Sequence, residues 1–359
     1  MYRLAESQRM RCSIAMNFNG ATQKPGMTID ELTSLADVES IISDWEALYE
    51  RCPDATPFHS PDWLVRWWKH FGFGRLWVLV VRRGRQVAGI APLFIHLYQD
   101  GQRSFRQLSP VGVGITDYMD FLLEPDCAPA ASELIFQHLV RRRRRWDGAG
   151  LQGLREGCGL LCAKTPRELK LGKKPDQPCP FIRLAGSRQH FLASLSRNRR
   201  HVYQSAQRKA SRLGSISFES AQLSSCEELI EALVQLNQAS RAKRRLRAAL
   251  DNPKVQMFHQ EVGNAFLRRG WLRMIAMRIG TRIVSVLHGL ASGQRSYCYQ
   301  TGFDPSFQQF SPGTVVQGQV IESAIEEGLS ELDFLRGDEP YKYWWGARNR
   351  QTYRLALQH

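Results

Sequence analysis

Two carboxylates near the C-terminal end of the chain stand where they could move a proton. Asp333 lies between Leu332 and Phe334 in a segment of strand character, so its side chain points to the opposite face from theirs. A strand carboxylate beside a binding cleft can act as a general base or orient an acceptor, and a salt bridge to a neighbouring arginine is the alternative. Glu339 follows in the loop after this strand and is the second candidate.

Three further side chains in this part of the chain can support such chemistry. Arg336 and Lys342 can hold phosphates or an anionic acceptor, or they can pair with nearby carboxylates. Tyr299 lies on an earlier strand, where its hydroxyl can protonate a leaving group, unless it is an inward-facing core tyrosine. We therefore predict Asp333, Glu339 and Tyr299 as catalytic residues.

The elements around these residues place them at a gap in a sheet. The apolar pattern predicts strands at 272–278, 282–291 and 295–302, then a helix at 314–327 and a strand at 331–335. Because a helix joins the third strand to the last one, the two lie side by side and parallel. In a twisted sheet such a pair can splay apart and expose backbone groups to an extended, amide-rich ligand. The pantetheine arm of coenzyme A is a ligand of this kind.

The predicted helix begins directly after Ser311-Pro312-Gly313-Thr314. Ser311 suits the N-cap position, and Gly313 allows the backbone to approach a phosphate closely. The free N–H groups and the dipole of a helix N-terminus favour a pyrophosphate. We therefore predict that Ser311, Gly313 and Thr314 bind an acyl-CoA co-substrate together with Arg336 and Lys342.

The length of 359 residues favours two domains, and a local repeat supports this division. Arg82-x-Gly84-x-x-Val87-x-x-Ile90 recurs as Arg278-x-Gly280-x-x-Ile283-x-x-Val286, with the same order of elements around each hairpin. The sequence thus predicts an α/β fold with two similar domains, each a mixed twisted sheet flanked by helices. The expected boundaries are a disordered lead at 1–27, an N-terminal domain at 28–180 and a C-terminal domain at 181–359, with 157–180 as the connection.

Composition and charge limit the class of protein. No run of about 18 apolar residues and no secretory signal is visible, and the eight cysteines form no CxxC pair, which predicts a cytoplasmic protein with reduced thiols and no metal site. The net charge is +15, and a predicted helix at 188–213 contains no acidic residue. Such a helix can steer coenzyme A or contact an anionic acceptor, a membrane surface or tRNA.

Several motifs together resemble the CelD-type acetyltransferases. These are proteins of the GNAT superfamily that are linked to bacterial cellulose and exopolysaccharide production and are related to the FemAB peptidyltransferases. The matching segments are Tyr297–Pro305, Ser311–Gly313, Asp333–Lys342 and Trp345 in the second half, Phe191–Arg200 in the centre, and Pro57–Trp63, Gly89–Leu93 and Thr116–Asp120 in the first half. The usual GNAT phosphate loop, an Arg or Gln followed by two spaced glycines, is replaced by Ser311–Thr314, which leaves open whether the donor is acetyl-CoA or another acyl-CoA.

The resemblance implies tandem GNAT-like domains and transfer of an acyl group to a nitrogen or oxygen atom. The expected acceptor is a saccharide or amino-sugar intermediate of polysaccharide or cellulose biosynthesis, held near Asp117, Asp120 and Trp63 between the two halves. A membrane surface or the polysaccharide-synthesis machinery is a further expected partner. Two alternatives remain: a FemAB-like peptidyltransferase that uses aminoacyl-tRNA, and a non-catalytic partner of a polysaccharide-synthesis assembly.

Overall fold

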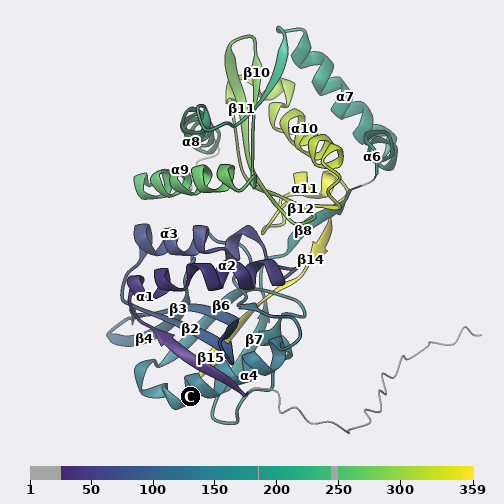
Figure 1. Ribbon diagram of the computed structural model, residues 1–359. Coiled ribbons are helices and arrows are strands. Elements are labelled where there is room, and N and C mark those ends of the chain that lie inside the picture. Colours follow the sequence, from purple (N-terminus) through teal and green to yellow (C-terminus); the bar gives the residue numbers. More distant parts are fainter. Residues whose placement is uncertain (1–25, 185, 244–249) are drawn as a thin grey trace, which may run out of the picture.

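The protein consists of two stacked lobes, each built on one mixed sheet with helices on its faces (Figure 1). The computed structural model describes residues 26–184, 186–243 and 250–359. The predicted α/β class with two mixed, helix-flanked sheets is confirmed. The predicted disordered lead falls almost wholly on residues 1–25, which lie outside the described residues; Met27 already begins the first strand.

The first lobe has the sheet order β1-β2-β3-β4-β6-β15-β7, with β5 beside β3. Its strands are β1 (Met27–Leu32), β2 (Arg75–Arg83), β3 (Gln86–Asp100), β4 (Arg103–Pro110), β5 (Leu122–Leu123), β6 (Gly148–Arg155), β7 (Lys170–Pro175) and β15 (Thr352–Gln358). Its helices are α1 (Leu35–Ser40), α2 (Ile42–Arg51), α3 (Pro61–Phe71), α4 (Ala128–Arg141) and α5 (Gly159–Cys162), with short 3-10 turns η1 (Pro57–His59) and η2 (Arg143–Arg145).

The second lobe has the sheet order β14-β8-β13-β12-β11-β10-β9. Its strands are β8 (Cys179–Arg183), β9 (Ile216–Ser220), β10 (Leu272–Ile279), β11 (Arg282–Ser292), β12 (Arg295–Phe303), β13 (Glu331–Asp333) and β14 (Arg348–Arg350). Its helices are α6 (Arg188–Ser194), α7 (Arg197–Ser211), α8 (Cys226–Lys243), α9 (Pro253–Arg268), α10 (Pro312–Glu326) and α11 (Pro340–Trp344), with the 3-10 turn η3 (Pro305–Phe310).

The two hairpins of the sequence repeat have the same geometry. Arg82 lies opposite Val87 and Arg278 opposite Ile283, and a register shift immediately precedes the arginine in both. Each arginine also bonds a carboxylate on the preceding strand and a carbonyl in its own turn: Arg82 uses Asp30 and Arg85, and Arg278 uses Glu219 and Thr281. The bulges and the turn contacts recur at the same sequence offset, and the carboxylate partners, at a different offset, lie on the equivalent preceding strand, which supports duplication of the domain.

The C-terminal strand returns to the first lobe. Strand β8 begins the second lobe and pairs with β13 of the second sheet, whereas β15 at the C-terminus pairs with β6 and β7 of the first sheet. The structure therefore differs from the expected division at residue 180, because 352–358 completes the N-terminal sheet. Segment 157–180, expected to be only a connection, supplies α5, β7 and the start of β8.

The two crossing segments run antiparallel beside each other, so that a two-stranded ribbon links the sheets. Strands β7 and β15 pair in the first lobe, and β8 and β14 pair in the second. Between them the Asp176 N–H donates to the Thr352 carbonyl at 2.9 Å, and the Thr352 hydroxyl donates to the Gln177 carbonyl at 2.6 Å. The yellow C-terminal segment in Figure 1 can be followed from β14 down into the lower lobe.

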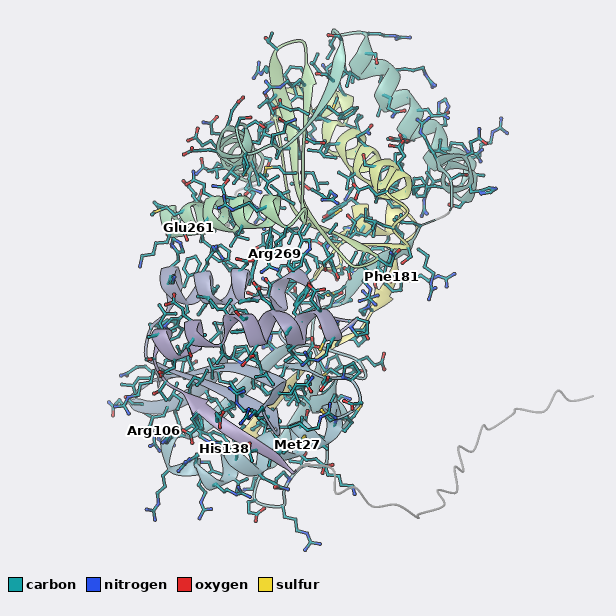
Figure 2. The ribbon with its side chains drawn as sticks, in the orientation of Figure 1. Met27, Arg106, His138, Phe181, Glu261 and Arg269 are labelled. Atoms are coloured by element: carbon teal, nitrogen blue, oxygen red, sulfur yellow. The ribbon has the colours of Figure 1, made fainter. Side chains whose placement is uncertain are left out.

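Helix α3 of the first lobe packs on α9 of the second, and one apolar core continues through this boundary. Trp63 makes edge contacts with Phe258, their ring centroids being 4.9 Å apart. At the rim Arg269 pairs with Asp62 and Glu46, and His70 lies 3.1 Å from Glu261 (Figure 2). Because the core is shared, the two lobes are held together as one body.

The basic segment 188–213 is divided into two helices rather than one. Leu195 is extended, and Ser196 then caps α7 by accepting a hydrogen bond from the Arg199 N–H at 3.3 Å. A serine placed between two turns of helix thus interrupts the predicted continuous helix. Within the described ranges, no helix is long and apolar enough to cross a membrane.

The returning strand β15 gives a direct test of the fold. Leu357 of β15 is fully buried in the first lobe's core, so Leu357→Ala should destabilise that lobe by about 2–5 kcal/mol. Hydrogen exchange should accelerate in β6 and β7 and remain slow in β10 and β11. Gln358→Ala, on the neighbouring exposed position, is the control and should change little. Faster hydrogen exchange confined to the second lobe would contradict the pairing of β15 with the first sheet.

Candidate functional site

A cavity of about 550 Å³ lies between the lobes where the ribbon crosses. Both lobes and the ribbon line it. Its polar lining comprises Asp54, Thr56, His59, Tyr118, Asp120, Arg155 and Glu156 from the first lobe, and Arg295, Tyr297, Asp333 and Arg350 from the second. The volume lies within the range of small-molecule sites, so the cavity can hold a ligand of the size of a small saccharide.

Asp333 is the hub of the polar contacts at this cavity. One carboxylate oxygen accepts from the Tyr118 hydroxyl at 2.6 Å and from Arg350 at 2.5 Å, and the other accepts from the Leu335 N–H at 2.7 Å. Burial raises the pKa of Asp333 to about 6, although Arg350 and Tyr118 pull it down. Asp333 lines the cavity and also forms the salt bridge that was the alternative to a catalytic role, which stays a prediction. Its three hydrogen bonds leave one of about four acceptor positions free.

Arg350 joins Asp333 to the ribbon and to the neighbouring strand. Its other terminal nitrogen donates to Glu331 at 2.7 Å, and its guanidinium lies 4.4 Å from the centre of the Phe181 ring. Phe181 lies at the junction of the lobes (Figure 2). The sequence analysis did not single out Arg350, because its partners are distant in sequence and only the strand pairing of β14 with β8 brings it to the site.

A tight loop holds Tyr118 in the cavity. Tyr118 has a φ of +51°, which is unusual for a residue other than glycine. The loop is fixed from behind, because the Trp63 indole N–H donates to the Thr116 hydroxyl at 2.8 Å. Trp63 is fully buried, so it supports the loop from the core and does not line the cavity beside the expected acceptor.

Asp120 lies on the cavity wall in a charged cluster. It accepts from the Arg155 guanidinium at 2.7 Å, and the His59 Nε2 atom is 3.7 Å away. Burial alone would raise the pKa of Asp120, but Arg155 and His59 outweigh burial and hold the pKa below its usual value. Asp120 is therefore an ionised carboxylate that can accept hydrogen bonds where the substrate that receives the acyl group is expected to bind.

Two buried polar atoms of the lining have no hydrogen-bond partner in the described part of the chain: His59 Nε2 and the Tyr297 hydroxyl oxygen. His59 accepts the Thr56 N–H through Nδ1 at 3.0 Å, which places its proton on Nε2. Burial raises the pKa of Tyr297 to about 12, so its hydroxyl stays protonated. Neither residue was predicted as a site residue, although the motifs Pro57–Trp63 and Tyr297–Pro305 contain them.

Asp117 does not line the main cavity but a second space of about 190 Å³ that Tyr118 also lines. Its Oδ1 atom lies 3.1 Å from the Arg336 Nε, and Arg336 also donates to the Gly114 carbonyl at 2.8 Å. Burial raises the pKa of Asp117, although Arg336 lowers it. Arg336 of the second lobe thus makes its polar contacts with two residues of the first lobe.

Lys342 and Glu339 belong to the loop that follows β13. The buried Lys342 ammonium donates to the carbonyls of Leu335, Arg336 and Gly337 at 3.0, 2.7 and 3.2 Å, and pairs with Glu339 at 2.9 Å. All of its donors are therefore used to shape the loop. The Glu339 side chain is about half exposed and does not line either cavity.

The expected gap between β12 and β13 is present. Their parallel pairing ends at Tyr297 and Asp333, whereas β12 continues to Phe303. Opposite β11 the register shifts so that His288 pairs with Gln300 and Gly289 with Cys298, which leaves Tyr299 as a bulge. The Tyr299 hydroxyl donates to the Ile115 carbonyl at 2.7 Å, so Tyr299 braces the lobe boundary and does not reach the cavity.

Helix α10 starts beyond the open end of this gap. Ser311 occupies the N-cap position as predicted, but its φ of +51° turns the hydroxyl away, and no side-chain cap bond forms. The added Cβ of a larger residue at Gly313 would meet only Phe303, at 3.8 Å. Thr314 lies in the first turn and is partly exposed. The N-terminus of α10 thus has no side-chain cap, and it is formed by Ser311, Gly313 and Thr314. The other two residues predicted to bind the donor, Arg336 and Lys342, make their hydrogen bonds within the protein.

Among the described residues, Glu124, Asp126 and Cys127 place potential metal-ligand atoms within 4.8 Å of one another. Arg83 pairs with both carboxylates at 2.6 and 2.8 Å, and burial raises the pKa of the Cys127 thiol to about 11. A protonated thiol and compensated carboxylates are poor ligands for a metal ion.

The Asp333–Arg350 pair can be tested by a double-mutant cycle. Arg350→Ala leaves the buried Asp333 carboxylate without its cation and should lower the free energy of unfolding by about 3–5 kcal/mol. Adding Asp333→Asn to this variant removes the stranded charge, so the double variant should be more stable than Arg350→Ala alone. Strictly additive losses, measured by denaturant unfolding at neutral pH, would show that the pair does not interact.

Comparison with known proteins agrees with the fold. The family model described as an acetyltransferase (GNAT) domain matches residues 197–343. No curated protein sequence matches the chain significantly. Solved structures resemble it at 12% identity: FemX covers 87% of this chain and 95% of its own at a TM-score of 0.59. The C-terminal domain of a putative lysylphosphatidylglycerol synthetase from Agrobacterium fabrum covers 91% and 92% at 0.56.

L-PGS from Bacillus licheniformis is similar at 12% identity and a TM-score of 0.53, over 88% of this chain and 91% of its own. At such identities the structural matches establish the fold alone. The chain shares its two-lobed α/β fold with these structures, and its segment 197–343 matches the GNAT acetyltransferase domain family.

Proposed function

We propose that the protein is an acyltransferase that moves the acyl group of an acyl-CoA to an acceptor held in the cavity between the lobes. The observation that carries this proposal is the position of Asp333. It ends the strand β13 at the point where β12 and β13 part, and it also lines the cavity. A donor in the gap and an acceptor in the cavity would therefore meet at this carboxylate.

The donor half of the proposal rests on the gap and on the start of α10. A pantetheine arm can bond the backbone of β12 beyond Tyr297, where no partner strand continues. The N-terminus of α10, a helix of 15 residues, offers free N–H groups and a favourable dipole to the pyrophosphate. The match of 197–343 to the acetyltransferase (GNAT) domain supports acetyl-CoA as donor, and a longer acyl-CoA is the alternative.

The proposed reaction is a direct attack on the thioester. The acceptor nitrogen or oxygen bonds the carbonyl carbon, the acceptor proton passes to the Asp333 carboxylate, and the carbon–sulfur bond breaks to release the CoA thiolate. The Asp333 oxygen that bonds Leu335 keeps an acceptor position free for this proton. Arg350 and Tyr118 orient the carboxylate and are positioning residues.

We further propose that the acceptor is a saccharide or an amino sugar of polysaccharide or cellulose biosynthesis. The cavity is large enough and its lining is rich in hydrogen-bonding groups. The resemblance of the motifs to the CelD-type acetyltransferases supports this pathway, and a cytoplasmic site of action would fit it.

A second candidate function is aminoacyl-tRNA-dependent transfer of the FemAB kind. Its supporting observation is the pair of basic helices α6 and α7, in which Arg197, Arg208, Lys209 and Arg212 are exposed around α7. Such a surface suits a phosphate backbone. If tRNA binds with an affinity that Arg208→Glu plus Lys209→Glu abolishes, and no acyl-CoA binds, this second function replaces the first.

Isothermal titration with acetyl-CoA and longer acyl-CoAs tests the donor site. Gly313→Val should weaken binding at least severalfold, because the side chain enters the space where a phosphate would approach, while the fold accommodates it. Gly172→Val, on the exposed strand β7 of the other lobe, is the matched control. No binding of any acyl-CoA below about 1 mM would contradict the donor assignment.

The pH dependence of transfer tests the base. A base acts in its deprotonated form, so kcat/KM should rise with pH through the Asp333 pKa of about 6. Asp333→Asn should abolish this dependence and lower kcat by about 10²–10⁴-fold. Glu339→Gln removes the other predicted carboxylate and should leave the profile unchanged. A profile that flattens in Glu339→Gln instead would assign the base to Glu339.

A further inference from the structure

The cavity differs in charge from the protein around it. The chain as a whole carries a net charge of +15. The cavity is lined by the four carboxylates of Asp54, Asp120, Glu156 and Asp333, and by the three guanidinium groups of Arg155, Arg295 and Arg350. The excess of arginine that dominates the surface is therefore absent from this lining.

Each guanidinium group of the lining is already engaged by a carboxylate of the protein. Arg155 bonds Asp120 at 2.7 Å, Arg295 bonds Asp54 at 2.8 Å, and Arg350 bonds Asp333 at 2.5 Å. A ligand carboxylate or phosphate would have to displace one of these partners and would face the remaining acidic groups. The Coulomb interaction with the lining thus opposes a bound anion.

The atoms that remain available to a ligand are a histidine nitrogen and a tyrosine hydroxyl. The His59 Nε2 atom and the Tyr297 hydroxyl are buried, line the cavity and make no hydrogen bond to the described residues, although Asp120 lies 3.7 Å from His59 Nε2. Both residues are less than 4% exposed. A buried donor without a partner costs free energy, and a ligand oxygen that accepts from it recovers that cost.

We infer that the cavity selects an acceptor that is uncharged or carries an ammonium group, and that His59 and Tyr297 bind its hydroxyl or ring oxygens. This inference rests on the proposed function and narrows its acceptor class to neutral saccharides and free amino sugars. Phosphorylated sugars, nucleotide-linked sugars and uronates are excluded from the cavity. The positive surface then serves the anionic donor, which approaches through the second lobe.

Titration with three disaccharides in the absence of any donor tests the inference. The probes are cellobiose, which is uncharged, the disaccharide of glucosamine, which carries ammonium groups, and the disaccharide of glucuronic acid, which carries carboxylates. We expect the first two to bind the full-length protein and the third to bind at least about tenfold more weakly. Tyr297→Phe should weaken the two favoured probes about three- to tenfold, because one hydrogen bond is lost.

The matched control is Tyr49→Phe. The Tyr49 hydroxyl is also buried and without a hydrogen-bond partner in the described ranges, but it does not line the cavity, so its removal should leave binding unchanged. Equal or tighter binding of the glucuronic acid disaccharide, no binding of either favoured probe, or the same loss in both tyrosine variants would each overturn the inference. Donor binding is measured separately, so these outcomes are distinguishable from a failure of the acyl-CoA assignment.

Discussion

The return of strand β15 to the first sheet is the constraint on which the rest of the structure depends. The second sheet is built from the continuous segment 179–350, whereas the first sheet is completed only by residues 352–358, which follow the second lobe in sequence. The crossing segments form the antiparallel ribbon that links the sheets, and the cavity lies at this crossing. The site can therefore draw its polar groups from both lobes at fixed separations.

The contacts of Asp333 come from both lobes and set its chemical properties. Tyr118 reaches it from the first lobe, Arg350 reaches it from the ribbon, and the backbone of Leu335 holds its second oxygen. Burying a carboxylate raises its pKa, while the arginine keeps the charged form accessible, and the balance near pH 6 suits a group that must take up a proton. The same contacts brace the lobe boundary, so stability and the proposed catalysis depend on one set of residues.

Periodicity and turn chemistry were sufficient to predict the hairpins, the parallel pair β12 and β13, and helix α10, because these depend on local spacing. They could not predict that β15 leaves its neighbours for the other sheet, since both sheets offer an edge to an apolar strand. The site residues also divide into those predicted from local motifs and those that depend on long-range strand pairing. Asp333 and Asp120 were predicted from motifs and line the cavity, whereas Arg350 and Tyr297 depend on strand pairing between distant segments. Tyr299 and Lys342 have the right residue types, but the fold uses their polar atoms for internal hydrogen bonds.

A transfer assay that follows the release of free CoA thiol from acetyl-CoA tests the proposed reaction as a whole. Release should require the glucosamine disaccharide, an equimolar amount of N-acetylated disaccharide should appear by mass spectrometry, and Asp333→Asn should lower both rates together. Thiol release that is independent of the disaccharide would contradict it. So would transfer to the disaccharide that proceeds only from aminoacyl-tRNA.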